Sequence, residues 1–226
     1  SEGYAKKRYY AGNKYVDEIE LLAIDRAKKL FKVPFANVQP YSGSPANLAV
    51  YFALCKPNDV IMGQSLNSGG HLTHGHNVSI TGKYFKAIQY NVLPQLKNGD
   101  LFDYQEILKL AKKHKPKIIW VGATAYPLKF NYRKFSEIAK EVNAYLVADI
   151  SHIAGLIVTG FHPSPINYAH IITTTTHKTL RGPRGAIIMV TEKGLEKDPE
   201  LPLKINKAVF PGIQGGPHDN QTAAIA

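Results

Sequence analysis

Three stretches in the second half of the chain decide its fold: Lys117-Ile118-Ile119-Trp120-Val121-Gly122, Ala144-Tyr145-Leu146-Val147-Ala148-Asp149 and Ile171-Ile172-Thr173-Thr174-Thr175-Thr176. Each is a short run of apolar or β-branched residues, a pattern typical of strands that are buried on both faces. Amphipathic helices are predicted on either side of the first run, over 103–115 and 132–143. Strands that alternate with helices predict an α/β fold of three layers, in which helices cover both faces of a mostly parallel central sheet.

The same patterns extend this fold toward both ends of the chain. Helical spacing of apolar residues predicts helices over 14–31 and 44–54, and extended segments are predicted at 35–39, 59–62, 85–90 and 186–190. Residues 64–75 are rich in Gly, Ser and His, so we expect a loop too polar to join the core. No internal repeat or linker-like stretch interrupts the chain, which favours a single domain.

Composition excludes several classes of protein. The chain has 226 residues, of which 44% are hydrophobic, so it is not a disordered segment. No apolar run approaches the roughly 20 residues of a membrane-spanning helix. The single cysteine, Cys55, excludes a disulfide framework and a cysteine-cluster zinc site, and it fits a reducing, cytoplasmic location. Because the chain starts at Ser1 rather than Met and stops at Ala226 in a helix-like stretch, we expect a fragment of a longer protein.

The charge balance suggests a nucleic-acid partner, but the distribution of charge argues against one. The chain has 28 Lys and Arg against 17 Asp and Glu, a formal net charge of +11. The lysines are scattered over predicted helix faces, and aromatic residues do not alternate with them as they do in a base-stacking surface. Solvated basic faces are therefore the favoured interpretation, and attraction of small anions remains open.

Polar residues collect directly after the predicted strands. Thr124 follows the first strand, Asp149 and His152 follow the second, and His177 and Lys178 follow the third. In open α/β sheets, ligands bind beyond the carboxyl ends of the strands. We therefore expect these side chains to share one edge of the sheet, together with Ser42-Gly43-Ser44 before the 44–54 helix.

Each of these features has a structural interpretation and a functional one. Ser42-Gly43-Ser44 is either a plain helix cap or a cradle for a phosphate group, and Asp149 either caps the next helix or serves the site. Lys178 is either a surface lysine or a partly desolvated amine with a lowered pKa, which would act as a nucleophile. His71 and His74 are three residues apart, but no third ligand is evident nearby, so no metal site is expected.

A lysine, a carboxylate and a phosphate cradle at one edge of a sheet match the requirements of pyridoxal 5'-phosphate. The lysine would form a Schiff base with the aldehyde of this cofactor, and the carboxylate would keep its ring nitrogen protonated. The start of the helix would hold the phosphate. No single feature is specific for the cofactor, but their combination favours it.

Longer stretches resemble a known family. The chain is similar to serine hydroxymethyltransferases over 39–44 (Gln-Pro-Tyr-Ser-Gly-Ser), 69–75 (Gly-Gly-His-Leu-Thr-His-Gly), 147–157, 173–185 and 212–217 (Gly-Ile-Gln-Gly-Gly-Pro). The matches run in family order across nearly the whole chain. The resemblance implies that residues 1–226 form the large, cofactor-binding domain of a fold-type I (aspartate aminotransferase-like) pyridoxal phosphate enzyme, without its N-terminal segment and its C-terminal small domain.

The resemblance also implies roles for individual residues toward the cofactor. Lys178 would be the Schiff-base lysine, Asp149 would pair with the ring nitrogen, and His71 would stack on the ring. The phenolic oxygen of the cofactor would lie near His152 and Thr124, and Arg184 would orient neighbouring groups. The phosphate would be held by Ser42, Gly43 and Ser44. Gly215 and Gly216 resemble the loop that reaches the phosphate of a partner subunit, which implies a homodimer or tetramer with shared active sites.

A second set of residues is implied to serve the substrates. Glu2 resembles a glutamate that handles the proton of the substrate hydroxyl and contacts folate, and Tyr10, beside Tyr9, resembles a substrate-side tyrosine. The pterin would be flanked by Leu66, Gly70 and Leu72. Thr175 and His177 would tune the neighbouring Lys178.

The reaction implied is the reversible transfer of a one-carbon unit from serine to tetrahydrofolate, which gives glycine and 5,10-methylenetetrahydrofolate. Two other hypotheses about function stay open. One is a folate-independent aldolase for threonine-like β-hydroxy amino acids, and the other is a non-catalytic basic RNA-binding fragment. We expect weak cofactor binding and poor turnover from this segment alone, because the arginine that the family uses for the substrate carboxylate lies in the missing C-terminal region.

One stretch departs from the family pattern. The family usually has Tyr-Pro-Gly-Lys-Arg-Tyr-Tyr-Gly-Gly where this chain has Tyr4-Ala5-Lys6-Lys7-Arg8-Tyr9-Tyr10-Ala11-Gly12. Loss of a Pro-Gly turn is expected to alter the loop that carries Glu2 and Tyr10.

Overall fold

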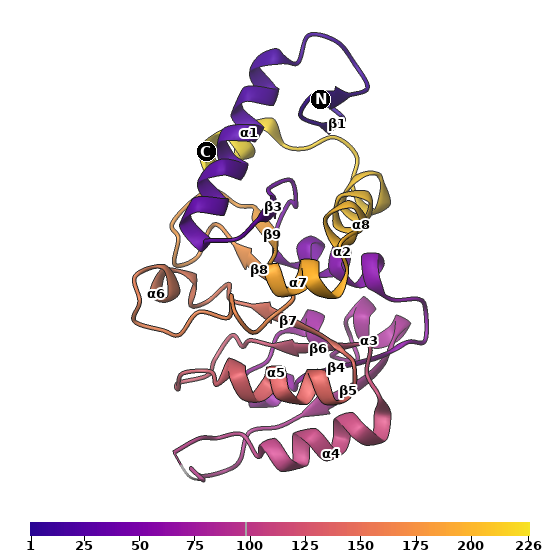
Figure 1. Ribbon diagram of the computed structural model, residues 1–226, viewed down its shortest axis with the longest axis vertical. Helices are drawn as coiled ribbons and strands as arrows, with labels where there is room; N and C mark the ends of the chain where they lie inside the picture. The colour runs from indigo at the N-terminus through magenta and orange to yellow at the C-terminus, as the bar shows by residue number, and fades with distance from the viewer. Residues whose placement is uncertain (98) are drawn as a thin grey trace.

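The computed structural model describes residues 1–97 and 99–226. Within these residues, seven strands form one sheet in the order β3-β9-β8-β7-β6-β4-β5 (Figure 1). The strands are β3 (Phe35–Asn37), β4 (Val60–Gln64), β5 (Lys86–Tyr90), β6 (Ile118–Val121), β7 (Tyr145–Asp149), β8 (Ile171–Thr175) and β9 (Ala186–Val190). All neighbours from β5 to β8 pair in parallel, whereas β9 pairs antiparallel with both β8 and β3. The predicted mostly parallel sheet is confirmed.

Helices cover both faces of this sheet. The longer ones are α1 (Lys14–Phe31), α2 (Gly43–Leu54), α4 (Tyr104–His114) and α5 (Tyr132–Glu141), all within two residues of their predicted bounds. Shorter helices complete the layers: α3 (Ile80–Tyr84), α6 (Ala154–Val158), α7 (Glu192–Lys197), α8 (Leu201–Lys207) and α9 (Asp219–Ile225). Except for α9, none of these short helices is predicted from the sequence, because one or two turns carry too little periodicity to be recognised.

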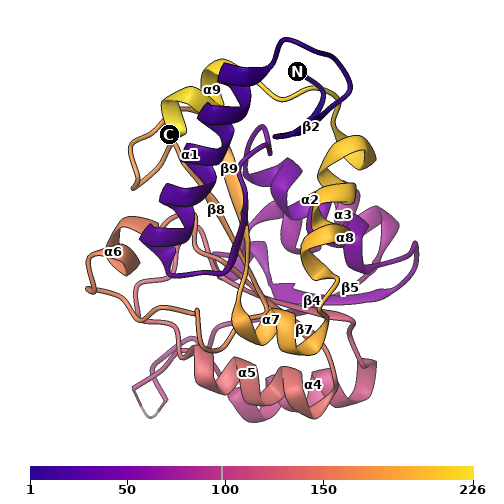
Figure 2. The ribbon, with the colours of Figure 1, turned by 45° about the horizontal axis from the view of Figure 1, so that its top comes forward.

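Alternating strand residues supply two separate cores. In β6, Ile118 and Trp120 face one core while Ile119 and Val121 face the other. The first core is closed by α2 and α8, and the second by α1, α4 and α5. Figure 2 shows α4 and α5 side by side along one face of the sheet. The predicted three layers are thus present, and the carboxyl ends of β6, β7 and β8 are left at one edge.

The expectation that residues 64–75 form a loop too polar to join the core is wrong for part of this segment. Gln64, Thr73 and His74 are buried, and His74 is only 1% exposed. Two short 3-10 turns, Leu66–Ser68 and Leu72–His74, fold this segment back toward the carboxyl ends of the strands. Thr73 and His74 can be buried because Thr73 Oγ1 accepts from Nδ2 of Asn47 and Nε2 of His74 bonds to Asp149, which offsets their desolvation.

A small hairpin that was not predicted lies at the start of the chain. Strands β1 (Gly3–Tyr4) and β2 (Lys7–Arg8) pair antiparallel, apart from the main sheet. In the part of the chain that the structure describes, no helix combines the length and the apolar character needed to cross a bilayer.

Candidate active site

A pocket opens where the carboxyl ends of β6, β7 and β8 meet the start of α2. It holds about 270 Å³ of empty space, part of which is open to solvent. We call it the lysine pocket, and its lining residues are Gly43, His71, His74, Ala123, Thr124, Asp149, Ser151, His152, Thr175 and Lys178. The predicted convergence of strand ends therefore brings together seven of the residues named for the cofactor or its lysine: Gly43, His71, Thr124, Asp149, His152, Thr175 and Lys178.

Asp149 is the buried carboxylate of the lysine pocket. Its Oδ2 lies 3.2 Å from Nε2 of His74 and accepts a hydrogen bond of 2.9 Å from Nδ2 of Asn47, while its Oδ1 accepts bonds from the amide and hydroxyl of Ser151. Burial alone would raise the pKa of this carboxyl, but His74, Asn47 and Ser151 together hold it well below its usual range. Asp149 does not cap the next helix, since α6 begins only at Ala154. Its carboxylate stays ionised at neutral pH.

The partners of Asp149 are themselves fixed by packing and hydrogen bonds. The ring of His74 stacks on Trp120, with centroids 5.0 Å apart and an interplanar angle of 17°. Asn47 Nδ2 also donates to Thr73 Oγ1, and Asn47 Oδ1 accepts from Thr173 Oγ1 at 2.8 Å. A closed network thus joins α2, β7, β8 and the 72–74 turn around one carboxylate.

Lys178 lies just beyond β8, where the chain leaves the sheet. Burial lowers the pKa of its amine, the nearby Asp149 carboxylate opposes this change, and the positive charge of Arg184 adds to it. Arg184 is not among the residues that line the pocket, so its influence on Lys178 is electrostatic. The direction of this shift agrees with the predicted partly desolvated amine, and its role as a nucleophile stays a prediction.

Three histidines surround the site with lowered pKa values, and all are neutral at pH 7. Burial, with a contribution from His74, lowers the pKa of His71 to about 4. Burial and Lys178 lower the pKa of His152, and burial with Arg184 lowers that of His177. His71 and His152 line the pocket, whereas His177 does not. The neutral imidazoles of His71 and His152 therefore add no positive charge beside Lys178.

The start of α2 faces the pocket through Gly43. A Cβ built at this position would lie 2.8 Å from Cγ2 of Thr175, so a larger residue would crowd the end of β8. Ser42 is the N-cap residue, but its side chain makes no capping hydrogen bond, and no acidic side chain occupies the first turn. The amides and hydroxyls of Ser42–Ser44 are therefore available to an anion, which favours the phosphate cradle over the plain cap.

Another group of predicted residues gathers elsewhere, at the N-terminal hairpin, by which we mean residues 1–10. Cγ of Glu2 lies 3.3 Å from where a Cβ of Gly216 would stand, and Gly215 is adjacent. Tyr10 is 67% exposed. Tyr41 connects the two regions, because its hydroxyl donates to the carbonyl of Gly216 at 2.6 Å and its neighbour is Ser42. Glu2, Tyr10, Gly215 and Gly216 do not line the lysine pocket of their own chain.

The three residues predicted to contact folate differ in exposure. Leu66 and Leu72 are exposed by 38% and 42%, while Gly70 is buried against the backbone of Gln64 and Ser65. None of the three lines the lysine pocket. Gly69 attaches this segment to the site, since its carbonyl accepts from the amide of Thr124 at 2.7 Å.

Sequence reasoning missed two features of the site. Asn47, one helical turn after Gly43, had no signal of its own, because only the folded chain brings it to Asp149. A third ligand beside His71 and His74 was judged absent, yet Asp149 supplies one: the donor atoms of all three lie within 4.8 Å of one another. Spacing along the sequence could not reveal this neighbour, which is 75 residues from His74.

Comparison with known proteins fits this arrangement. A sequence profile described as serine hydroxymethyltransferase matches residues 1–226. The chain belongs to the serine hydroxymethyltransferase family. Curated relatives named serine hydroxymethyltransferase are 54% identical over 226 residues in Acidothermus cellulolyticus, 55% over 226 in Orientia tsutsugamushi, and 56% over 228 in Wolbachia pipientis subsp. Culex pipiens.

These matches cover all of this chain but only part of each relative. In each of the three cases the alignment takes in 100% of this chain and 51% of the relative. The chain thus spans about half the length of the serine hydroxymethyltransferases it matches, and both residue groups described above, the lysine pocket and the N-terminal hairpin, fall inside the shared half.

Proposed function

We propose that residues 1–226 are the cofactor-binding large domain of a pyridoxal phosphate-dependent serine hydroxymethyltransferase. The complete enzyme would transfer a one-carbon unit from serine to tetrahydrofolate. The observation that carries this proposal is the pairing, in one pocket, of a lysine with a lowered pKa and a buried carboxylate held ionised by His74 and Asn47. Family membership over the whole chain supports it.

The pocket residues fit the cofactor. Oγ1 of Thr175 is buried at the pocket without a hydrogen-bond partner among the described residues, so a ligand oxygen can satisfy it. Gly43 lines the pocket at the start of α2, and Ser42 and Ser44 on either side of it carry hydroxyls that could bind a phosphate. The Lys178 amine would hold the cofactor aldehyde covalently, while His71, His152 and Thr124 would contact the ring.

When bound, pyridoxal phosphate supplies an electron sink for the pair released as the Cα–Cβ bond of serine breaks. Asp149 would keep a proton on the ring nitrogen, because the carboxylate that faces it stays ionised. The lowered pKa of Lys178 raises the fraction of neutral amine, the form able to attack a carbonyl carbon. Neutral His71 would lie against the ring without adding a charge that competes with Asp149.

Glu2 and Tyr10 would act on the substrate hydroxyl and on folate, and Gly215 and Gly216 would reach the phosphate of a partner subunit. Because none of the four lines the lysine pocket of its own chain, this part of the proposal requires a second copy, in a dimer or tetramer with shared sites. Leu66, Gly70 and Leu72 would contact the pterin, and His177 and Arg184 would tune Lys178.

Borohydride reduction in the presence of pyridoxal phosphate, followed by peptide mapping, tests the cofactor assignment. We expect the pyridoxyl label on Lys178, and its loss in Lys178→Ala. Lys197→Ala is the matched control, since burial also lowers the pKa of Lys197 but this lysine lies outside the pocket. A label that remains in Lys178→Ala and moves to Lys197 would contradict the assignment.

Formation of glycine from serine, with and without tetrahydrofolate, tests the reaction in the full-length enzyme. A hydroxymethyltransferase needs the folate for rapid serine cleavage. Equal rates without folate would instead support an aldolase on the same scaffold. Salt-sensitive RNA binding that survives Lys178→Ala, with no serine cleavage, would support the binding-module reading.

A further inference from the structure

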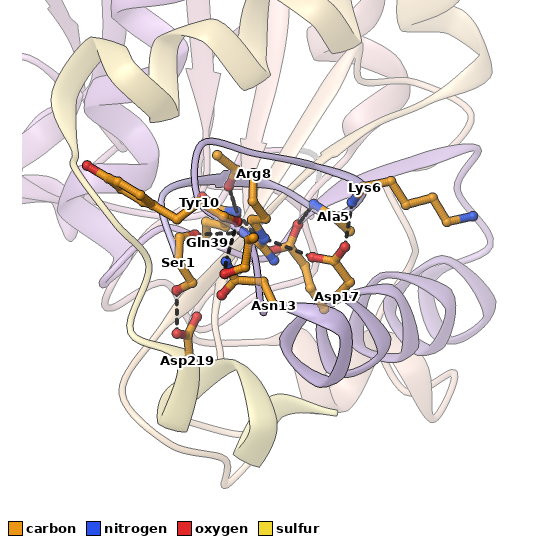
Figure 3. Close-up of polar contacts among 12 residues, drawn as sticks. Ser1, Ala5, Lys6, Arg8, Tyr10, Asn13, Asp17, Gln39 and Asp219 are labelled. Atoms are coloured by element: carbon orange, nitrogen blue, oxygen red, sulfur yellow. Dashed lines mark hydrogen bonds and ion pairs between the residues drawn. The ribbon is translucent and has the colours of Figure 1, made fainter.

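The N-terminal hairpin is held by side chains rather than by a sheet. It has only the two-residue strands β1 and β2, which pair with each other alone. Arg8, at the end of β2, turns its side chain back beneath the hairpin, and Figure 3 shows it among Ser1, Asp17 and Gln39. The Arg8 side chain is 3% exposed. A buried arginine under so short a hairpin calls for a specific set of partners.

Those partners bracket Glu2. Nη1 of Arg8 donates to the carbonyl of Ser1 at 3.0 Å and to the carbonyl of Gly3 at 2.7 Å, the residues on either side of Glu2. The carbonyl of Glu2 itself accepts from the amide of Tyr9 at 3.1 Å. One guanidinium therefore fixes the backbone before and after the Glu2 side chain.

The guanidinium is in turn held by two carboxylates of α1. Nε of Arg8 donates to Asp17 and Nη2 donates to Glu20, both at 2.9 Å. Glu20 is 2% exposed, so this pair lies away from water, and Glu20 also accepts from Nε2 of Gln39 at 2.8 Å. The planar guanidinium donates to the carboxylates and to the backbone carbonyls at once, so it is held in one orientation. A lysine, with a single ammonium group, could not make the same set of bonds.

The same carboxylates hold the hairpin turn at which this chain departs from its family. The amide of Ala5 donates to Oε1 of Glu20 at 3.1 Å, and the amide of Lys6 donates to Oδ2 of Asp17 at 2.8 Å. A proline at position 5, the usual family residue, has no N–H to give to Glu20. The Ala5 amide thus ties the turn to the carboxylate that also holds Arg8.

These contacts form a continuous chain from α1 to Glu2. Asp17 and Glu20 orient Arg8, Arg8 fixes the carbonyls on both sides of Glu2, and the Glu2 side chain rests against Gly215 and Gly216. We propose that Arg8 is a positioning residue, which with Asp17 and Glu20 sets where the Glu2 carboxylate stands in the active site that the hairpin completes. This inference rests on the proposed function, in which Glu2 handles the proton of the substrate hydroxyl.

A double-mutant cycle in the full-length enzyme tests this proposal. Arg8→Lys keeps the charge and removes the fork, and we expect kcat for serine with tetrahydrofolate to fall by on the order of 10²-fold, the usual cost of a misplaced catalytic group. In a Glu2→Gln background, Arg8→Lys is expected to change kcat less than about twofold, since the group it positions is already gone. The matched control is Arg133→Lys, an exposed arginine paired with Glu137 on α5, which should leave kcat unchanged.

The outcomes separate three explanations. If Arg8→Lys lowers kcat equally in the parent enzyme and in the Glu2→Gln background, Arg8 acts through something other than the Glu2 carboxylate and the proposal is overturned. An unchanged kcat in Arg8→Lys overturns it as well. Borohydride labelling of Lys178 is measured in every variant, because a parent enzyme that takes no label or transfers no one-carbon unit would contradict the proposed function itself.

A second variant keeps the proposal testable if Arg8→Lys does not fold. Asp17→Asn weakens only one of the two anchors of Arg8, at a carboxylate that is 20% exposed, so the fold should tolerate it. We expect a smaller loss of kcat, about tenfold, which again disappears in the Glu2→Gln background. A loss that persists there would contradict the positioning role.

Discussion

The lysine pocket and the N-terminal hairpin hold their functional residues by opposite means. Asp149 and Lys178 are placed by β7 and β8, whose backbones are paired on both sides within a buried sheet. Glu2 is placed by side chains, chiefly Arg8, which is anchored in turn on α1. The pocket is therefore sensitive to changes in its own polar groups, whereas the hairpin is sensitive to changes in residues that touch no ligand.

The largest expected effect belongs to the pocket. In Asp149→Asn, an amide replaces the only carboxylate lining the pocket among the described residues. Under the proposed function the cofactor ring would lose its charged partner, and transfer should fall by about 10²- to 10³-fold. The measurement is kcat with saturating cofactor. Asp59→Asn is the control, because Asp59 is also a carboxylate with a lowered pKa but pairs with Lys117 at the opposite end of β6. If kcat fell equally in Asp149→Asn and Asp59→Asn, the loss could not be attributed to the position of Asp149 in the pocket.

The pH dependence of cofactor capture tests the electrostatics of Lys178. Only the neutral amine attacks an aldehyde, so the capture rate should rise about tenfold per pH unit and level off at the pKa of Lys178, below the usual 10.5. Removing the positive charge in Arg184→Gln should raise that pKa and move the plateau to higher pH. Stopped-flow absorbance measures both curves. A plateau that moves to lower pH would contradict the assigned role of Arg184.

A smaller effect is expected where α2 meets β8. In Gly43→Ala, the new Cβ would stand 2.8 Å from Cγ2 of Thr175, and overpacking of this kind costs about 1–3 kcal/mol. Cofactor affinity should fall about tenfold, measured by titration with pyridoxal phosphate. An unaltered affinity would show that the phosphate cradle does not depend on this close approach.

The smallest effect is expected in the hairpin turn and concerns stability alone. Lys6 has φ +64, a left-handed conformation that glycine adopts without strain, so Lys6→Gly should stabilise the protein by about 1 kcal/mol. A rise in melting temperature of about 2–4 °C would report this gain. Lys7→Gly is the control: Lys7 lies in β2 and not in the left-handed region, and it should lose stability instead.

The two regions also differ in how far the sequence predicts them. Asp149 and Lys178 were predictable because runs of apolar and β-branched residues identify buried strands. The residues at the end of such a run must lie at the carboxyl end of the strand. His74 and Asn47 were not predicted to contact Asp149. They lie in a loop and a helix, and the local sequence there does not indicate which strand the side chain will contact in the fold. The hairpin was less predictable still, because its strands are two residues long and its anchors, Asp17 and Glu20, look like ordinary charges on an amphipathic helix.

The first residue of the hairpin has a further contact with consequences for motion. Ser1 Oγ donates to Asp219 at the start of α9, and the neighbouring His218 stacks on Tyr41 with centroids 4.1 Å apart. The hairpin, the 214–218 segment and the start of α2 are thus linked by side chains, outside the strand pairing of the sheet. In hydrogen exchange, the amides of 3–9 and 214–222 should open together as one cooperative unit, with lower protection than the amides of β6 to β8.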